Sequence, residues 1–510
     1  MQDRGAAGAT RRTAPEEPRP PAATGAHPSG RGARRRYLEV ATEVAAKVRP
    51  GVGRSYLAAA VELADLVERL GRSRSSLYRL WPSQHDFWHD LTLHLVFQND
   101  YLKPDEWLPW DVSKLPVDVA PQRDPAADTE LVRVTLGLIQ DWTLQDPWIQ
   151  VRSALLGYAD VPEVAEARRR VEARRIRHLA ARTAAVLALS GAGVAAPLQA
   201  IDVATGVWCL GDGFAVLNRS RPSIGTRVVE LDRGLGPRPW GLFAYAAGHA
   251  LTAMADPDAG PAVVDPDPGP TPAALYDEVS ARWTESQRDA LREATALFLE
   301  RLGPPVPGAH AEPPAGGEIR SLGHVTVADV ARQAGVSRRS VYNHWSSSED
   351  LRLDLLRWLL AAERNRYVAG LDRVVASPPR AERARVDAVL AALLVHPAPN
   401  RIPIPHLPLA FLAEADHPAV RPVLERGHAE MVTAVASRVD RLWPTDRRAT
   451  GADLDTEDLA VLLLSLVTGA NRLRRIVPQA LWRADRTLQS PPALVATLDP
   501  LVTSTPRTEV

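Results

Sequence analysis

The chain has 510 residues, with 61 basic and 61 acidic side chains and a formal net charge of zero. It is long enough for several domains with large cores. A zero net charge excludes a global basic field, so any affinity for nucleic acid must come from local basic clusters. The single cysteine, Cys209, excludes an intramolecular disulfide framework and suits a reducing cytoplasm.

The first 33 residues are rich in Ala, Pro, Gly and Arg, a composition typical of a disordered tail. They contain no apolar run of the kind found in signal peptides. Arg31 and Arg34–Arg36 are read in two ways. They belong either to a solvated tail, which we favour, or to an arm that enters a neighbouring minor groove.

Residues 62–87 reappear as residues 326–351 without a gap, and we call these segments the first copy and the second copy. Ten of the 26 aligned positions are identical, including the run Ser-Arg-x-Ser-x-Tyr-x-x-Trp. In the second copy, apolar residues at 327, 330, 331 and 334 lie on one face of a predicted helix. Gly335 then permits a sharp turn, and Ser337 can cap a second, short helix. The first copy has the same pattern.

Two helices joined by a glycine turn, the second basic and aromatic on its outer side, are typical of a major-groove reader. Arginine can pair with guanine edges or contact phosphates, and hydroxyl groups position a protein on phosphate oxygens. The alternative is a hairpin in an ordinary all-α domain whose arginines are merely solvated. The candidate DNA contacts are Ser73, Arg74, Ser75, Tyr78 and Arg79 in the first copy and Ser337, Arg338, Arg339, Ser340, Tyr342 and Asn343 in the second.

The regions after the two copies also align, with a shift of 256 instead of 264, and both contain long helical patterns at 161–189 and 419–443. The stretches 202–219 and 458–475 are apolar and carry small residues, among them Gly206, Gly213, Gly469 and Ala470. They are either helices that pair two subunits or simple core helices. Cys209 is interpreted as a core residue.

Aromatic residues Trp142, Trp148 and Trp208 cluster in the first of these regions and line either an effector pocket or the core. Residues 396–408 contain two histidines ten apart, which is poor metal spacing, so a loop that shapes a pocket is the better interpretation. The sequence lacks the common catalytic and phosphate-binding motifs. We therefore expect no enzyme activity, no metal and no cofactor. The apolar stretch 459–470 is too short to span a bilayer.

The second copy resembles the DNA-binding domain of TetR-family transcriptional regulators, because Thr326–Leu351 follows the family pattern almost throughout. The resemblance implies that Ser337–His344 is the recognition helix and that Tyr342 and His344 touch phosphates. It also implies a first helix before each motif, at 35–48 for the first copy and at 284–302 for the second. Thr284 and Gln287 form a predicted capping box there.

The chain departs from the family pattern at several places. Residues 303–323 intervene where relatives have a short loop, and we interpret them as a surface insertion. Arg72 replaces the usual valine, and Leu80 replaces the histidine. Arg72 is either an extra phosphate contact or a sign of a degenerate DNA-binding head. Glu62 and Glu68 make the first copy more acidic.

We therefore expect an all-α tandem of two TetR-like units. The predicted boundaries are a disordered tail at 1–33, a first helix-turn-helix domain at 34–100, a first effector domain at 101–255, a Pro-rich linker at 256–280, a second helix-turn-helix domain at 281–366 and a second effector domain at 367–510. The predicted function is a cytoplasmic, ligand-responsive repressor, with double-stranded operator DNA and an unknown small-molecule effector as partners and no membrane. One chain acts as a pseudo-dimer, or two chains pair. The alternative is a sensor or interaction module whose heads no longer bind DNA.

Overall fold

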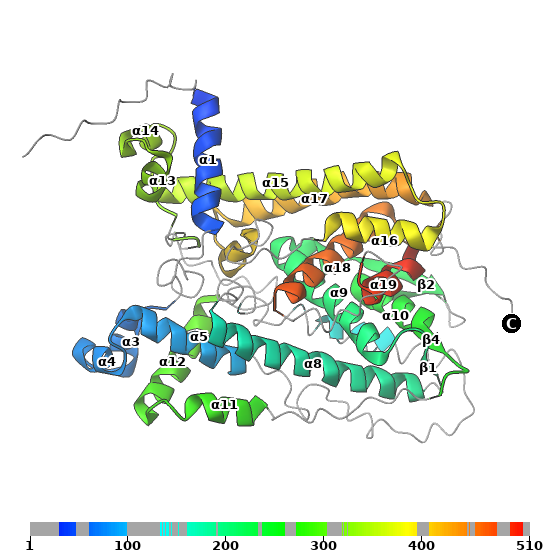
Figure 1. The fold of residues 1–510 in the computed structure, drawn as a ribbon, viewed down its shortest axis with the longest axis horizontal. Coiled ribbons are helices and arrows are strands. Elements are labelled where there is room, and N and C mark those ends of the chain that lie inside the picture. The colour runs from blue at the N-terminus through cyan, green and yellow to red at the C-terminus, as the bar shows by residue number, and fades with distance from the viewer. Residues whose placement is uncertain are drawn as a thin grey trace, which may run out of the picture.

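The structure is a computed structural model that describes residues 30–46, 61–98, 161–189, 192–232, 237–260, 272–302, 319, 321–323, 325–394, 407–445, 448, 454–476 and 490–502, with scattered positions between 133 and 151. Most of these residues are helical (Figure 1), in agreement with the predicted all-α class. Two long predicted helices, at 161–189 and 419–443, are present as α8 (Pro162–Leu189) and α17 (Arg421–Leu442).

The remaining helices of the N-terminal half are α1 (Gly30–Ala46), α3 (Leu63–Leu70), α4 (Arg74–Leu80), α5 (Gln84–Gln98), α9 (Ala200–Ser220), the short 3₁₀ helix η2 (Pro222–Ile224) and α10 (Leu242–Met254). The C-terminal half adds α11 (Pro272–Ser280), α12 (Glu285–Leu302), α13 (Val327–Ala334), α14 (Arg338–Tyr342), α15 (Ser348–Ala376), α16 (Glu382–Leu393), the 3₁₀ helix η4 (Pro408–Glu414), α18 (Thr456–Ile476) and α19 (Pro492–Val502).

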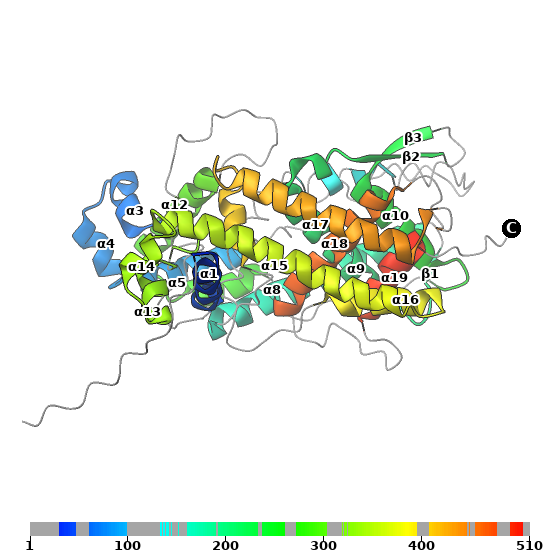
Figure 2. The same cartoon turned by 90° about the horizontal axis from the view of Figure 1, so that it is seen from above.

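Helices α9 and α18 form the centre of the molecule and pack against each other. On one side α8 covers α9, and on the other α17 covers α18 while α15 packs against α17 (Figures 1 and 2). Gly213 and Gly469 occupy the closest approach. A Cβ on Gly213 would lie 1.8 Å from the carbonyl oxygen of Ser465, and one on Gly469 would lie 1.9 Å from that of Cys209. The stretches 202–219 and 458–475, expected to be either subunit-pairing helices or core helices, therefore pack against each other within one chain and are buried in its core. Gly206 instead faces Thr497 of α19.

The two largest hydrophobic clusters divide the molecule along its length. One cluster gathers both sequence copies, α1, α11, α12 and the start of α15. The other contains α9, α10, α16, α18 and α19. Cys209 is fully buried in the second cluster, where burial and the nearby Asp212 raise the pKa of its thiol. Its interpretation as a core residue is confirmed.

Two short antiparallel sheets were not predicted. Strand β1 (Gly193–Val194) pairs with β4 (Ala255–Asp256), and β2 (Val228–Asp232) pairs with β3 (Pro237–Gly241). In the second sheet Val229 lies opposite Trp240, and both are buried, whereas Val228 is exposed. Adjacent valines suit the pleated backbone of a strand, because β-branched side chains pack well there.

The structure corrects three predicted boundaries. The predicted linker 256–280 is too long, because residues 272–280 form helix α11 with Leu275 buried against α5. Its sequence has one proline, at the first helical position, followed by good helix formers. The predicted tail 1–33 overlaps α1, which begins at Gly30. The predicted boundary at 366 falls inside the continuous helix α15.

Helix α9 is long and apolar enough to span a bilayer by length and composition alone, with a mean hydropathy of 1.4. In the structure 83% of the apolar window of α9 is buried by other parts of the protein. Its apolar character is accounted for by its central position between α8 and α18.

Candidate nucleic-acid interface

The turn between the two helices has the same geometry in both sequence copies. Gly71 ends α3 with φ of 59°, and Gly335 ends α13 with φ of 67°. In each, the amide of the next residue closes the turn by donating to a carbonyl five residues earlier: Arg72 to Val67 and Val336 to Ala331, at 3.2 and 3.0 Å. This is a Schellman ending, in which a left-handed glycine satisfies the last carbonyls of a helix.

The second helix of each copy is capped and anchored as predicted. The hydroxyls of Ser73 and Ser337 accept the amides of Ser76 and Ser340, both at 3.2 Å. Leu77 and Trp81 are buried beneath α4, and Val341 and Trp345 are buried beneath α14. The indole of Trp81 donates to Asp90 at 2.9 Å, and that of Trp345 donates to Asp354 at 3.2 Å. Both short helices are therefore fixed to the helix that follows them.

The candidate contacts share one pattern of exposure. From Gly71 to Leu80 and from Gly335 to His344, all ten aligned positions fall in the same exposure class. Tyr78 and Tyr342 are 36% and 51% exposed, and they are two of three large hydrophobic residues exposed in the described part of the chain. The other predicted contacts divide into an exposed group, Ser73, Arg74, Ser75, Arg79, Ser337, Arg338, Arg339 and Asn343, and a half-buried group, Arg72, Ser340 and His344.

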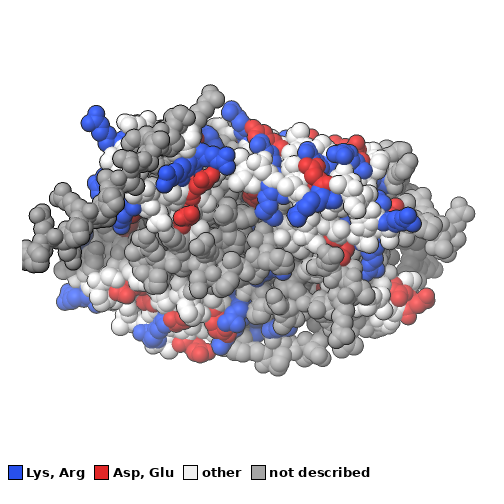
Figure 3. All heavy atoms as spheres, turned by 45° about the horizontal axis from the view of Figure 1, so that its top comes forward, with Lys and Arg blue, Asp and Glu red and all other residues white. Residues whose placement is uncertain are grey.

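Basic side chains project where these helices lie. Figure 3 shows Lys and Arg at the upper and lower left of the molecule, at the end where Figure 1 places α14 and α4. Acidic side chains lie beside the basic ones at the lower left and over the rest of the drawn face. In the first copy the guanidinium of Arg74 lies 5.6 Å from the ring centre of Tyr78, so the two side chains share one surface. Such a surface can contact phosphates and base edges.

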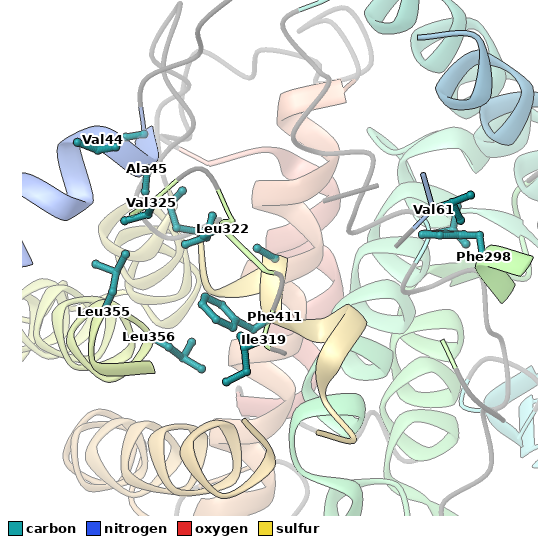
Figure 4. Close-up of a cluster of buried hydrophobic side chains, with 14 of the residues drawn as sticks. Val44, Ala45, Val61, Phe298, Ile319, Leu322, Val325, Leu355, Leu356 and Phe411 are labelled. Carbon is teal, nitrogen blue, oxygen red and sulfur yellow. The ribbon is translucent and has the colours of Figure 1, made fainter. Parts of the chain in front are cut away.

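Helix α1 packs against the second copy, not the first. The ring of Tyr37 lies 5.5 Å from that of His344 and 6.4 Å from that of Trp345. Arg34 donates to Asp354 of α15 at 2.9 Å. Figure 4 shows Val44 and Ala45 of α1 beside Val325, which precedes α13.

Helix α12 makes the reciprocal contact with the first copy. Arg69 of α3 donates to Glu293 and Glu300 of α12, at 2.9 and 2.7 Å. The side chain of Gln287 donates to the carbonyl of Leu80 at 3.0 Å, close to the end of α4. Phe298 lies beside Val61 in the same cluster (Figure 4). Each copy is thus supported by a first helix that belongs to the other half of the chain.

This exchange contradicts the prediction that 35–48 supports the first copy and 284–302 the second. Both segments are helices, and the predicted capping box of Thr284 and Gln287 is present. The predicted packing partners of these two helices were wrong, because the apolar face of a first helix can pack against either of two similar copies. The sequence signal was the length of chain between each first helix and the copy that follows it, 47–61 and 303–325. Most of the predicted surface insertion, 303–323, lies outside the described residues, and a connection of that length permits exchange.

The predicted effector residues are only partly described. Trp142 and Trp148 lie outside the described residues. Trp208 is half-buried, and the guanidinium of Arg175 lies 5.3 Å from its ring centre. Its role stays a prediction. Among the described residues, no group of three or more metal-ligating side chains is placed together.

One comparison with known proteins gives a match. Residues 320–355 match the family described as bacterial regulatory proteins, tetR family. No curated protein and no solved structure matches the chain. The matched segment contains the whole of α13, α14 and their turn, so it supports a DNA-binding transcriptional regulator. The regulator class that it supports is that of the TetR family.

Proposed function

We propose that the chain is a single-chain regulator in which both sequence copies are DNA-binding heads and the two halves form a pseudo-dimer. The observation that carries the proposal is the equal geometry and exposure of the two recognition surfaces, although the family match covers only the second. The mutual packing of α9 and α18 through aligned glycines supports an approximate two-fold relation between the halves. Two equivalent heads on one scaffold can enter successive major grooves, about 34 Å apart.

The two heads would read different half-sites. They differ at four aligned positions on or beside the recognition surface, namely Arg72/Val336, Ser75/Arg339, Arg79/Asn343 and Leu80/His344. Arginine can pair bidentately with guanine, whereas asparagine suits adenine. The operator should therefore be an imperfect palindrome or asymmetric, with Tyr78 and Tyr342 contacting equivalent phosphates.

The regulator would act in the cytoplasm as a ligand-responsive repressor. A small molecule bound among the helices beyond the heads would favour a state in which the head separation no longer fits the operator. The continuous helix α15 supports this coupling, because it begins at the second head and extends to α16 at the far end.

A mobility-shift assay with the promoter DNA upstream of the gene tests the DNA-binding part. We expect Tyr78→Ala combined with Tyr342→Ala to abolish the shift, and Val228→Ala, which changes the third exposed hydrophobic residue, to leave it unchanged. Binding should also weaken steeply with salt, because phosphate contacts release counterions. Intact binding by the double variant would exclude the head assignment.

A second function is favoured by the acidity of the first copy. Glu62 and Glu68 are exposed on α3, and Arg69 is paired with two carboxylates of α12. The chain would then be a sensor or interaction module in which one or both heads no longer bind DNA. Genome-wide binding separates the two functions, since the sensor predicts no enriched sites. Solution mass with and without operator distinguishes one chain with two heads from a homodimer with four.

A further inference from the structure

Helix α8 runs from the first copy to the opposite end of the molecule (Figure 1). Its first turn is buried with the first copy, because Val164 belongs to the same hydrophobic cluster as α3, α4 and α5. Further along, Ala180 and Ala184 form a small cluster with Ala200 of α9. A helix of 28 residues spans about 42 Å, so a displacement at the central helix pair can reach the first copy through α8.

Four titratable side chains join the start of α8 to the first copy. Glu163, in the first turn of α8, accepts from the guanidinium of Arg282 and contacts the imidazole of His89 at 3.0 Å. Arg282 lies between α11 and α12 and also donates to Asp90 of α5 at 3.3 Å. His89 and Asp90 are neighbours in the sequence, so the four side chains form a closed ring. Burial raises the pKa of Glu163, but hydrogen bonding with His89 and the charge of Arg282 outweigh burial and lower it, so the carboxylate stays ionised.

The ring reaches α4, the recognition helix of the first copy, through Asp90. One carboxylate oxygen of Asp90 accepts from Arg282, and the other accepts from the indole of Trp81 at 2.9 Å. Trp81 ends α4 and is buried against Phe87, with the ring centres 5.2 Å apart. The side chain of Asp90 is only 16% exposed, so these two partners set its orientation. Arg282 therefore positions Asp90, and Asp90 positions the end of α4.

The second copy repeats the inner part of this arrangement. Asp354 of α15, the counterpart of Asp90, accepts from the indole of Trp345 and from Arg34 of α1. In each copy, therefore, an arginine from the other half of the chain contacts the carboxylate that anchors the tryptophan. Among the described residues Arg34 makes no second ion pair, whereas Arg282 bridges to α8.

The outer part of the ring is missing from the second copy because of two sequence differences. With the shift of 264, His89 corresponds to Leu353, and with the shift of 256, Glu163 corresponds to Ala419. Leu353 and Ala419 are apolar and pack against the hydrophobic cluster that contains both copies. Neither can join an ion pair. Within the described ranges, the start of α8 is thus joined to the first copy by charges that the start of α17 lacks.

We propose that Arg282 is a positioning residue that links α8 to the recognition helix of the first copy, so that a movement of α8 reaches the first copy directly and the second copy only through the shared core. The ion pairs of the ring are partly exposed, and such pairs contribute little to overall stability. The expected effect is therefore local to α4. The consequence for DNA rests on the proposed function, whereas the link itself can be measured without DNA.

Amide hydrogen exchange of the full chain without DNA, followed by mass spectrometry, measures the link. We expect Glu163→Gln to speed exchange in α4 by about threefold to fivefold, the range of a partly exposed ion pair, and to leave α14 unchanged. Glu166→Gln is the matched control, because Glu166 pairs with Arg169 and Arg170 of α8 itself. It should change neither helix. No change in α4, or an equal change in α4 and α14, would overturn the inference.

Arg282→Gln separates positioning from a general structural role. It should speed exchange in α4 at least as much as Glu163→Gln does, and adding Glu163→Gln should have little further effect, because the bridge is already cut. Arg282→Lys keeps the charge but lacks the guanidinium fork, so its α4 should exchange at a rate between those of the wild-type chain and Arg282→Gln. Fully additive effects of Arg282→Gln and Glu163→Gln would contradict the link.

The mobility-shift assay is read separately from the exchange measurement. Glu163→Gln should weaken operator binding, because a less ordered α4 contacts DNA less well, and Glu166→Gln should not. If α4 loosens as expected but operator binding is unchanged, the link stands and the proposed role of the first copy as a DNA-binding head fails.

Discussion

Arg69 of α3 donates two hydrogen bonds to the carboxylate of Glu300 in α12, both at 2.7 Å, although 231 residues separate them in the sequence. This pair marks the exchange of first helices between the two copies. An exposed ion pair contributes little stability by itself. The apolar contacts beside it, such as Phe298 against Val61, provide most of the energy that holds α12 on the first copy.

The exchange predicts crossed effects of mutations on the two copies. Phe298→Ala removes a fully buried ring and should cost roughly 3–5 kcal/mol locally, since core phenylalanines do so elsewhere. We expect faster amide hydrogen exchange in α3 and α4 with little change in α13 and α14. Tyr37→Ala should give the opposite pattern. If Tyr37→Ala loosens α3 and α4 instead, each first helix belongs to its own copy.

The contact between α9 and α18 should tolerate no side chain at its closest point. Gly469→Ala places a Cβ 1.9 Å from the carbonyl oxygen of Cys209, so the helices must separate, at a cost of about 1–3 kcal/mol or more. Gly211→Ala is the matched control, because its Cβ would meet only the ring of Phe243 at 3.3 Å. Urea denaturation should give a lower midpoint for the first variant. Equal midpoints would place the closest approach elsewhere.

A buried ion pair crosses the same contact. Asp212 of α9 accepts from Arg472 of α18 at 2.7 Å, and their side chains are only 7% and 3% exposed. Arg472→Leu should cost about 3–5 kcal/mol, because it removes the cation that contacts the buried carboxylate of Asp212. Adding Asp212→Leu should recover most of that loss. The comparison uses unfolding free energies of the two single variants and the double variant, and additive losses would exclude a coupled pair.

Stability should fall on mild acidification because of His94. Burial, with a smaller contribution from the charge of Arg292, lowers the pKa of His94 from 6.5 to about 4. The folded state therefore keeps the ring neutral while the unfolded state takes up a proton. The stabilisation, of order 3 kcal/mol, is present above pH 6.5 and is lost as the pH falls from 6.5 to 4.

This effect should be absent in His94→Gln, which cannot titrate. We expect the difference in unfolding free energy between pH 7 and pH 5 to be smaller in the variant than in the wild-type chain. Tyr276 contacts His94 at 3.0 Å, so α11 should detach early. A parallel acid profile for both proteins would assign the loss to other groups.

Local features were predictable because their causes are local. Gly71, Gly335 and the serine caps follow from backbone conformation and hydrogen bonding within a few residues. The small residues of α9 and α18 indicated a close helix contact but left open whether the two helices pair subunits or only build the core. The packing partners of α1 and α12 were not predictable from the sequence. Each of these helices can pack against either of two similar surfaces that are distant in sequence.

The exchanged first helices also impose an order on biosynthesis. Helix α1 leaves the ribosome early, but its partners α13 and α15 follow only after residue 326. At about 5–20 residues per second, α1 waits on the order of 15–60 seconds for the surface it covers. The first copy likewise stays incomplete until α12 is made. A nascent chain therefore exposes an incomplete first copy until α12, which ends at Leu302, has been translated.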